Sequence, residues 1–113
     1  MNLIKETENN DPNLQFSPFA LTDIKGNWQY LAERGEAAAA RLIKEITDKC
    51  GLLARNPKIG RERNDLILNL RQFPFKNYNI YYFPIENGVE IYRVLHSSRD
   101  NIQVFDDVVD EIK

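Results

Sequence analysis

The segment RVLHSSRD, residues 93–100, combines the only histidine of the chain with two arginines and an aspartate. Imidazole titrates near neutrality without help, so His96 is the first candidate for proton transfer. Arg93, together with Arg71 upstream, could hold a phosphate group and neutralise charge that develops on it. Such a set would suit RNA cleavage by the 2′-hydroxyl group, which needs a base, an acid and cations around the phosphate.

The same segment also fits the end of an ordinary strand. In that interpretation His96 bonds to backbone, while Arg99 and Asp100 form a surface ion pair. Only one plausible base is present, because serines occupy positions 97 and 98, where a second group such as tyrosine would help. The residues alone leave three interpretations open: a catalytic site, a partner-binding site and a structural strand end.

A second group of basic residues lies in RNPKIGRER, where Arg55, Lys58, Arg61 and Arg63 face only Glu62. The formal net charge of −2 is uneven, at −2 over residues 1–12, −4 over residues 100–113 and +4 between them. A basic stretch of this kind could meet an acidic partner, although it is also typical of a solvated loop.

Several classes of protein and site are disfavoured by composition. At 113 residues the chain is long enough for one domain with its own core. Its single cysteine, Cys50, excludes an internal disulfide, and no Cys/His pattern predicts a metal site. No glycine-rich phosphate loop appears, and no apolar run approaches the roughly 20 residues of a membrane span. We therefore expect a soluble cytoplasmic protein without a cofactor.

The first half of the chain predicts a strand and two helices. NLQF, residues 13–16, can form a short strand, and Ser17-Pro18 then supplies an N-cap with proline at the first helical position. An apolar stripe that includes Trp28 continues until Gly35, which offers a left-handed stop. A second helix runs from Glu36 to the residue before Asn56-Pro57. The short link predicts an antiparallel helical hairpin.

The second half has the composition of strands. DLILNLRQF (65–73), NYNIYYFPI (77–85) and VEIYRVLH (89–96) are rich in Ile, Val, Tyr and Phe. Asn87-Gly88 predicts a tight hairpin, and Pro84 predicts a bulge or longer loop, because it has no N–H to donate. In the simplest register Leu95 shares a face with Ile80, and Val94 lies on the opposite face with Tyr81.

The C-terminal residues predict an amphipathic helix. Ile102, Phe105, Val109 and Ile112 recur at spacings of three and four, and acidic residues fall mainly off this stripe. We expect this helix to pack on the sheet face that the hairpin leaves uncovered. The organisation expected is α+β: a flexible leader (1–12), a domain with an N-terminal strand, a helical hairpin and a three-stranded antiparallel meander (13–100), and an acidic C-terminal helix (101–113).

Three segments in this order resemble the ParE branch of the RelE/ParE superfamily of bacterial toxin–antitoxin systems: SPFALTDIKGNWQYLAERG, LLARNPKIGRERNDL and LRQFPFKNYNIYYFPIENGVEIYRVLHSSRD. The most specific pieces are NPKIGR, LRQFPF and RVLHSSRD. The resemblance runs from about Leu14 to Asp100 and implies the same order of elements.

The resemblance also implies a function. It indicates a small cytoplasmic toxin that is not an enzyme, inhibits DNA gyrase and is neutralised by an antitoxin that wraps it; such systems are associated with plasmid stabilization. We expect no membrane partner and no direct nucleic-acid binding by the toxin alone. Candidate antitoxin contacts are Trp28, Arg55, Lys58, Arg61 and Arg63, and candidate target contacts are Arg93, His96 and Arg99.

Two alternatives remain beside this expectation. The sister RelE-like toxins are ribosome-dependent mRNA interferases. By position Arg71 and His96 would match their active-site residues, and His96, Arg71 and Arg93 would form the catalytic set here. The strand-end tyrosine and the dense lysine cluster of that branch are absent, which favours the ParE branch. The third possibility is a chain that has lost its toxicity and still binds an antitoxin.

Overall fold

The computed structural model describes residues 12–112, with side chains described up to Asp106. Strand β1 (Asn13–Phe16) leads into helix α2 (Pro18–Ala32), which forms a hairpin with helix α3 (Glu36–Arg55). Strands β2 (Arg61–Glu62), β3 (Arg71–Phe75), β4 (Tyr78–Ile85) and β5 (Gly88–His96) follow, and helix α4 (Asn101–Ile112) ends the described chain. Residues 1–11 of the expected leader lie outside the described residues.

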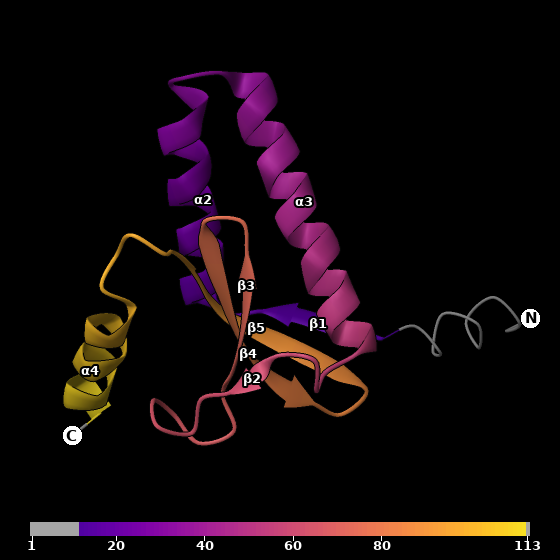
Figure 1. Ribbon diagram of the computed structural model, residues 1–113, viewed down its shortest axis with the longest axis vertical. Coiled ribbons are helices and arrows are strands. Elements are labelled where there is room, and N and C mark those ends of the chain that lie inside the picture. Colours follow the sequence, from indigo (N-terminus) through magenta and orange to yellow (C-terminus); the bar gives the residue numbers. More distant parts are fainter. Residues whose placement is uncertain (1–11, 113) are drawn as a thin grey trace, which may run out of the picture.

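The predicted α+β class is confirmed, with a mixed sheet of five strands in the order β1-β5-β4-β3-β2. β1 runs parallel to β5, and the other neighbouring strands are antiparallel. The helical hairpin rises from one side of the sheet, while α4 lies apart from it (Figure 1). Among the described helices, none combines the length and apolar character that crossing a bilayer requires.

The start of α2 follows the sequence expectation. Ser17 Oγ accepts a hydrogen bond from Ala20 N at 3.0 Å and donates one to Tyr92 O at 2.7 Å. The cap therefore also ties the helix to strand β5. The expected left-handed stop at Gly35 was wrong: α2 ends at Ala32, and Gly35 has an extended φ of 161°.

Two hydrophobic cores lie on the two faces of the sheet. The first packs the helical hairpin against the sheet through Ala20, Ile46, Cys50, Leu53, Ala54, Tyr78, Ile80, Tyr82, Val89, Ile91 and Val94. Burial there raises the pKa of the Cys50 thiol to about 12. The second core contains Leu70, Tyr81, Leu95, Val104 and Phe105. Helix α4 thus covers the face that the hairpin leaves open.

The apolar stripe of α4 differs in part from the sequence expectation. Phe105 is buried and stacks edge-on against Tyr81 at 4.7 Å between ring centroids. Val104 is buried beside it, whereas Ile102 is 55% exposed. The expected contributions of Val109 and Ile112 lie outside the described side chains. The helix docks through the side of its first turns that carries residues 104 and 105.

The β4–β5 hairpin differs from the simple register in two ways. Its turn is Glu86-Asn87, between the paired residues Ile85 and Gly88, and Asn87 has a φ of 58°. Gly88 belongs to the strand, because a Cβ there would overlap the backbone of Asn13 on β1. A bulge at the Tyr81/Tyr82 level leaves an extra residue on β5.

The bulge reverses the faces of the residues that follow it. Val94 therefore packs in the first core and Leu95 in the second, opposite to the simplest register. A bulge was predicted from Pro84, but the extra residue is on β5, opposite the step from Tyr81 to Tyr82 on β4. Pro84 pairs with Val89.

The segment DLILNL is a loop, so the expected strand 65–73 was wrong over its first six residues, 65–70. Strand β3 begins only at Arg71. Asn64 Oδ1 accepts a hydrogen bond from Asn69 N at 2.7 Å, and Asn69 has a φ of 71°. Such side-chain bonds compete with a strand ladder. The loop instead places Leu70 in the second core.

Candidate functional site

The guanidinium group of Arg93 is held by a buried carboxylate on α2. Its Nε and Nη2 donate to the two oxygens of Asp23 at 2.8 and 2.9 Å. Asp23 also accepts a hydrogen bond from Val94 N at 3.0 Å. The side chains of Arg93 and Asp23 are only 12% and 7% exposed, and the hydrogen bonds to Asp23 raise the pKa of Arg93. This arginine therefore joins α2 to β5.

His96 lies at the end of β5, next to α2. Its Nδ1 accepts a hydrogen bond from Ser98 N at 3.1 Å, and its ring packs edge-on against Tyr78. A cavity of about 250 Å³ beside it is also lined by Asn27 and Arg99. No ion pair of Arg99 occurs among the described side chains. The expected Arg99–Asp100 pair was wrong, because Asp100 accepts from Gln103 N in the first turn of α4.

The structure does not bring the nuclease candidates together. Arg71 pairs with Tyr82 on β4, whereas His96 pairs with Tyr78 on the other side of that strand. Four residues along a strand correspond to about 13 Å, far more than the reach of one phosphate group. Arg93 is already occupied by Asp23. No general base with convergent cations is formed by these three residues in this arrangement.

Arg71 fixes the loop that follows α3. Its Nη1 donates to Lys58 O at 3.1 Å and to Gly60 O at 2.7 Å. The buried hydroxyl of Tyr82 donates to Pro57 O and accepts from Gly60 N, both at 2.8 Å. A Cβ at Gly60 would lie 2.5 Å from that hydroxyl. The motif NPKIGR therefore describes a loop bonded closely to the sheet.

The candidate antitoxin contacts occupy two separate places. Trp28, 40% exposed, lies near the closed end of the helical hairpin, whereas Arg55 ends α3 at its open end. The 20 residues of α3 span about 30 Å. Arg63 is held by Asp65 at 2.9 Å, and this hydrogen bond raises the pKa of Arg63. Arg61 contacts Gln72 at 3.5 Å.

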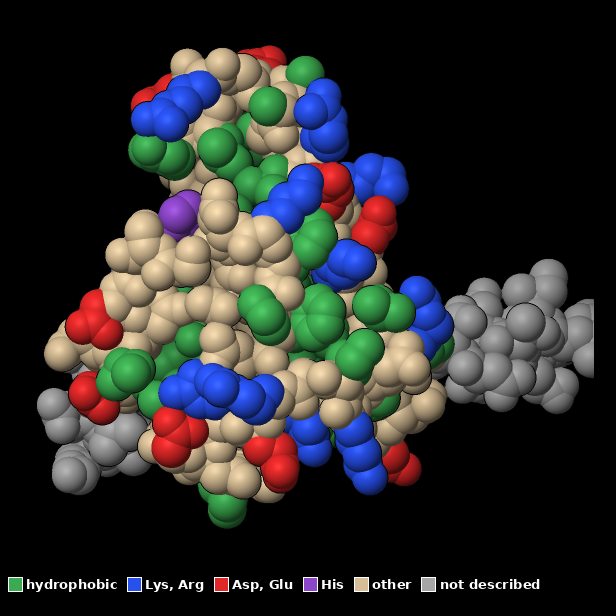
Figure 2. All heavy atoms as spheres, viewed as in Figure 1, with side chains coloured by type: hydrophobic (Ala, Val, Ile, Leu, Met, Phe, Trp, Pro, Cys, Tyr) green, Lys and Arg blue, Asp and Glu red, His purple; other side chains and the backbone are tan. Residues whose placement is uncertain are grey.

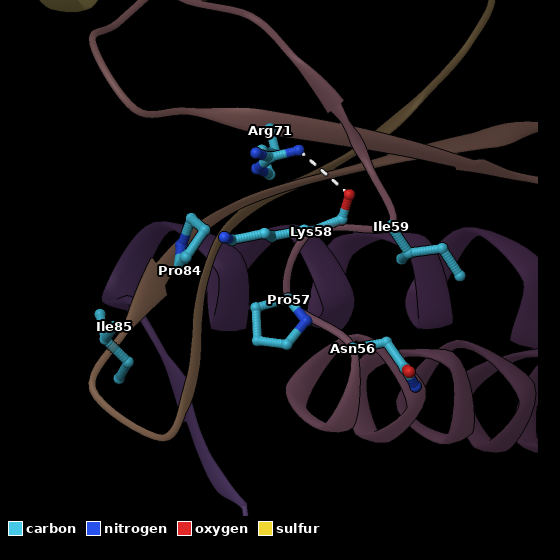
Figure 3. A pocket seen from close by; sticks show the side chains of 7 residues that line it. All are labelled: Asn56, Pro57, Lys58, Ile59, Arg71, Pro84 and Ile85. Atoms are coloured by element: carbon cyan, nitrogen blue, oxygen red, sulfur yellow. Dashed lines mark hydrogen bonds between the residues drawn. The ribbon is translucent and has the colours of Figure 1, made fainter.

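Lys58 and Arg71 do come together, at a cavity of about 620 Å³ (Figure 3). The remaining lining residues are Asn56, Pro57, Ile59, Pro84 and Ile85. Figure 2 shows Lys and Arg side chains in several separate groups on this view of the molecule, some of them beside Asp or Glu, without one continuous basic face. No group of three or more potential metal ligands occurs among the described residues.

Sequence reasoning missed two residues that organise these sites. Asp23 gave no signal in the sequence, because the apolar stripe of α2 indicates the face that carries Trp28, whereas the structure buries Ala20 and the Asp23 side chain. Tyr82 gave none either, since nothing in YNIYYFPI distinguishes it from the neighbouring tyrosines.

Comparison with known proteins agrees with this fold. A chain from the chromosomal ParDE toxin–antitoxin system of P. aeruginosa is similar in structure, with a TM-score of 0.64 and 14% sequence identity. The match covers 77% of this chain and 97% of that chain. Comparison with curated protein sequences gave no match.

The family model of the ParE toxin of the type II toxin–antitoxin system parDE matches residues 14–101. The match ends where α4 begins. It covers the helical hairpin, the sheet and all the candidate site residues described above. The chain therefore belongs to the ParE toxin family of type II toxin–antitoxin systems.

Proposed function

We propose that this protein is a cytoplasmic toxin that inhibits DNA gyrase without being an enzyme itself, and that a cognate antitoxin neutralises it. The observation that carries the proposal is the family match over residues 14–101, which makes a type II toxin the supported class. Inhibition of gyrase is the activity that the ParE resemblance implies.

The geometry supports a binding function over RNA cleavage. Arg93 is held by Asp23, and Arg71 is bonded to the loop after α3. His96 lies at the end of β5, away from Arg71. Among the residues that line its two cavities, the other acid–base groups are Asp23 and two tyrosines, Tyr30 and Tyr78. Asp23 is already paired with Arg93, and burial raises the pKa of Tyr78, so both groups are poorly suited to shuttle a proton. This leaves Tyr30 among these lining residues, without the pair of free arginines that the catalytic hypothesis requires.

The target contacts that we propose are Arg99 and His96, which share the cavity between α2 and the end of β5. Arg93 contributes indirectly, because its ion pair with Asp23 holds α2 against β5 beside this cavity. For the antitoxin, Trp28 and the exposed cations Arg55, Lys58 and Arg61 are the available contacts, whereas Arg63 is largely engaged by Asp65.

The decisive experiment compares two activities of the purified protein. Gyrase supercoiling of a relaxed plasmid, with measurement of trapped cleaved DNA, should be inhibited in a dose-dependent way. Ribosome-bound message should remain intact at the same concentrations. The preformed toxin–antitoxin complex serves as the control and should leave gyrase active.

Other outcomes would redirect the proposal. A toxic protein that cuts ribosome-bound message and leaves gyrase untouched would be a RelE-like interferase. Harmless overexpression with intact antitoxin binding would instead indicate a chain retained only for that interaction.

A further inference from the structure

The cavity at the open end of the helical hairpin combines apolar walls with two cations. It lies between the loop that follows α3 and the end of β4, and its volume is about 620 Å³. Pro57, Ile59, Pro84 and Ile85 supply apolar surface. Figure 3 shows the Lys58 side chain extending toward Pro84, with Arg71 above it. We name this site the Lys58–Arg71 pocket.

An acidic neighbour of this pocket lies outside its lining: Glu62 pairs with Arg71 across β2 and β3 and shares an adjacent, smaller cavity with Arg71 and Pro84. None of the seven lining residues is acidic, and no ion pair of Lys58 or Arg71 occurs among the described side chains. Two cations beside an apolar wall repel each other more than they would in open water. A carboxylate placed between them would relieve that repulsion and gain charge-assisted hydrogen bonds.

The pocket is also held in shape before any ligand arrives. Arg71 is anchored through Nη1 on two backbone carbonyls, and Tyr82 bonds to both Pro57 and Gly60 of the same loop. Asn56 caps the end of α3 through its backbone N and its Nδ2, which both donate to Leu52 O. A site that is already ordered loses little conformational entropy when it binds.

We propose that the Lys58–Arg71 pocket binds one acidic side chain of the antitoxin, with the apolar neighbours of that residue packed on Pro57, Pro84 and Ile85. The inference rests on the proposed function, because it takes the antitoxin as the partner that supplies the segment. A nucleic acid fits less well, since two cations beside apolar walls neutralise few phosphates and the chain has a formal net charge of −2.

The test uses the full chain and two short probes. Acetyl-Leu-Glu-Leu-amide and acetyl-Leu-Gln-Leu-amide differ only in the charge of the central side chain. In ¹⁵N NMR titrations, the glutamate peptide should shift the amides of Ile59, Arg71 and Ile85. The glutamine peptide should bind about three- to tenfold more weakly, the range expected for a partly exposed charge-assisted contact.

Two variants isolate the contribution of the pocket. Lys58→Gln should weaken the glutamate peptide by about three- to tenfold and leave the glutamine peptide unchanged. Lys44→Gln removes the same charge from an exposed position on α3 and should have no effect. Equal affinities for the two peptides, shifts that centre elsewhere, or no binding at about 10 mM peptide would each overturn the carboxylate site.

The source of the acidic residue is tested with the purified toxin–antitoxin complex. There the glutamate peptide should cause none of these shifts, because the antitoxin already fills the pocket. Shifts as large as those of the free toxin would overturn the antitoxin as occupant. Neither arm measures toxicity, so failure here leaves gyrase inhibition standing, and failure of gyrase inhibition leaves this test intact.

Discussion

The two ends of the sheet use their basic residues in different ways. At the end of β5 beside α2, Arg93 donates from Nε and Nη2 to the two carboxylate oxygens of Asp23, and its side chain is only 12% exposed. At the open end of the helical hairpin, Arg71 spends one nitrogen on backbone carbonyls, and Lys58 extends into a cavity without an acid. Arg93 therefore stabilises the fold, whereas Lys58 and Arg71 remain available to bind a partner.

The comparison shows why residue type alone misjudges a site. Arg93 and His96 are close in sequence and include the chemistry that a nuclease needs, yet the fold engages one of them fully. Lys58 and Arg71 are separated by 13 positions and look like parts of unrelated segments. Whether a basic side chain is available for binding depends on whether a residue distant in sequence already engages it, and the tertiary structure determines that contact.

The largest expected effect comes from breaking the buried pair. Asp23→Ala leaves Arg93 charged and nearly buried without its carboxylate, which should cost about 3–5 kcal/mol of unfolding free energy. Urea unfolding followed by circular dichroism measures it. Asp48→Ala removes the partner of an exposed ion pair on α3 and should cost no more than about 1 kcal/mol. Equal losses in both variants would mean that the Asp23–Arg93 pair contributes no more than a surface contact.

A smaller loss should follow from releasing the loop after α3. Tyr82→Phe deprives Gly60 N and Pro57 O of their hydroxyl partner, at an expected cost of about 1–3 kcal/mol. Tyr30→Phe, on a side chain that is 57% exposed, is the matched control and should change stability by less than about 0.5 kcal/mol. Amide exchange of Gly60 should accelerate in Tyr82→Phe. Unchanged protection there would show that Tyr82 does not hold the loop.

Much of the fold follows from local signals in the sequence. Ser17-Pro18 predicts the start of α2, the Ala-rich stripe predicts α3, and the runs of β-branched and aromatic residues predict β4 and β5. These elements depend on neighbours a few residues away, so their residue patterns carry the information. The confirmed C-terminal helix belongs to the same class, since its apolar spacing is visible within 12 residues.

The remainder depends on contacts between distant residues. The position of the bulge decides whether Val94 or Leu95 faces the hairpin, and no local pattern fixes it. Likewise, Asp23 and Arg93 are separated by 70 positions, and Tyr82 meets Pro57 across 25. The basic candidates could therefore be named from the sequence, but not divided into those that hold the fold and those that remain available.

Lys58→Gln should leave the stability of the protein almost unchanged, in contrast to the loss expected when the Asp23–Arg93 pair is broken. Because Lys58 has no ion pair among the described side chains, its charge should contribute less than about 0.5 kcal/mol to stability. The same substitution should slow association with the antitoxin at low salt, since a cation at the interface accelerates encounter with an acidic partner. Thermal unfolding and surface plasmon resonance measure the two quantities. A large loss of stability would place Lys58 with Arg93 among the residues that hold the fold.

The smallest effect on function is expected from His96→Gln, which tests the end of β5 directly. The imidazole Nδ1 contacts both the backbone N and the Oγ of Ser98, and the ring makes an edge contact with Tyr78; a glutamine can replace these contacts in part. Stability should therefore change by less than about 1 kcal/mol. Growth inhibition in cells without antitoxin should be largely retained, because Arg99 remains at the proposed target surface and a glutamine amide can still hydrogen-bond there. A nuclease that used this imidazole for proton transfer would lose about 10² to 10⁴ in rate.

Toxicity abolished in a variant that still unfolds at the wild-type temperature and still binds the antitoxin would contradict the prediction. His96 would then be essential for action on the target, and parallel assays of gyrase supercoiling and message cleavage with the same variant would tell a lost gyrase contact from a lost catalytic base.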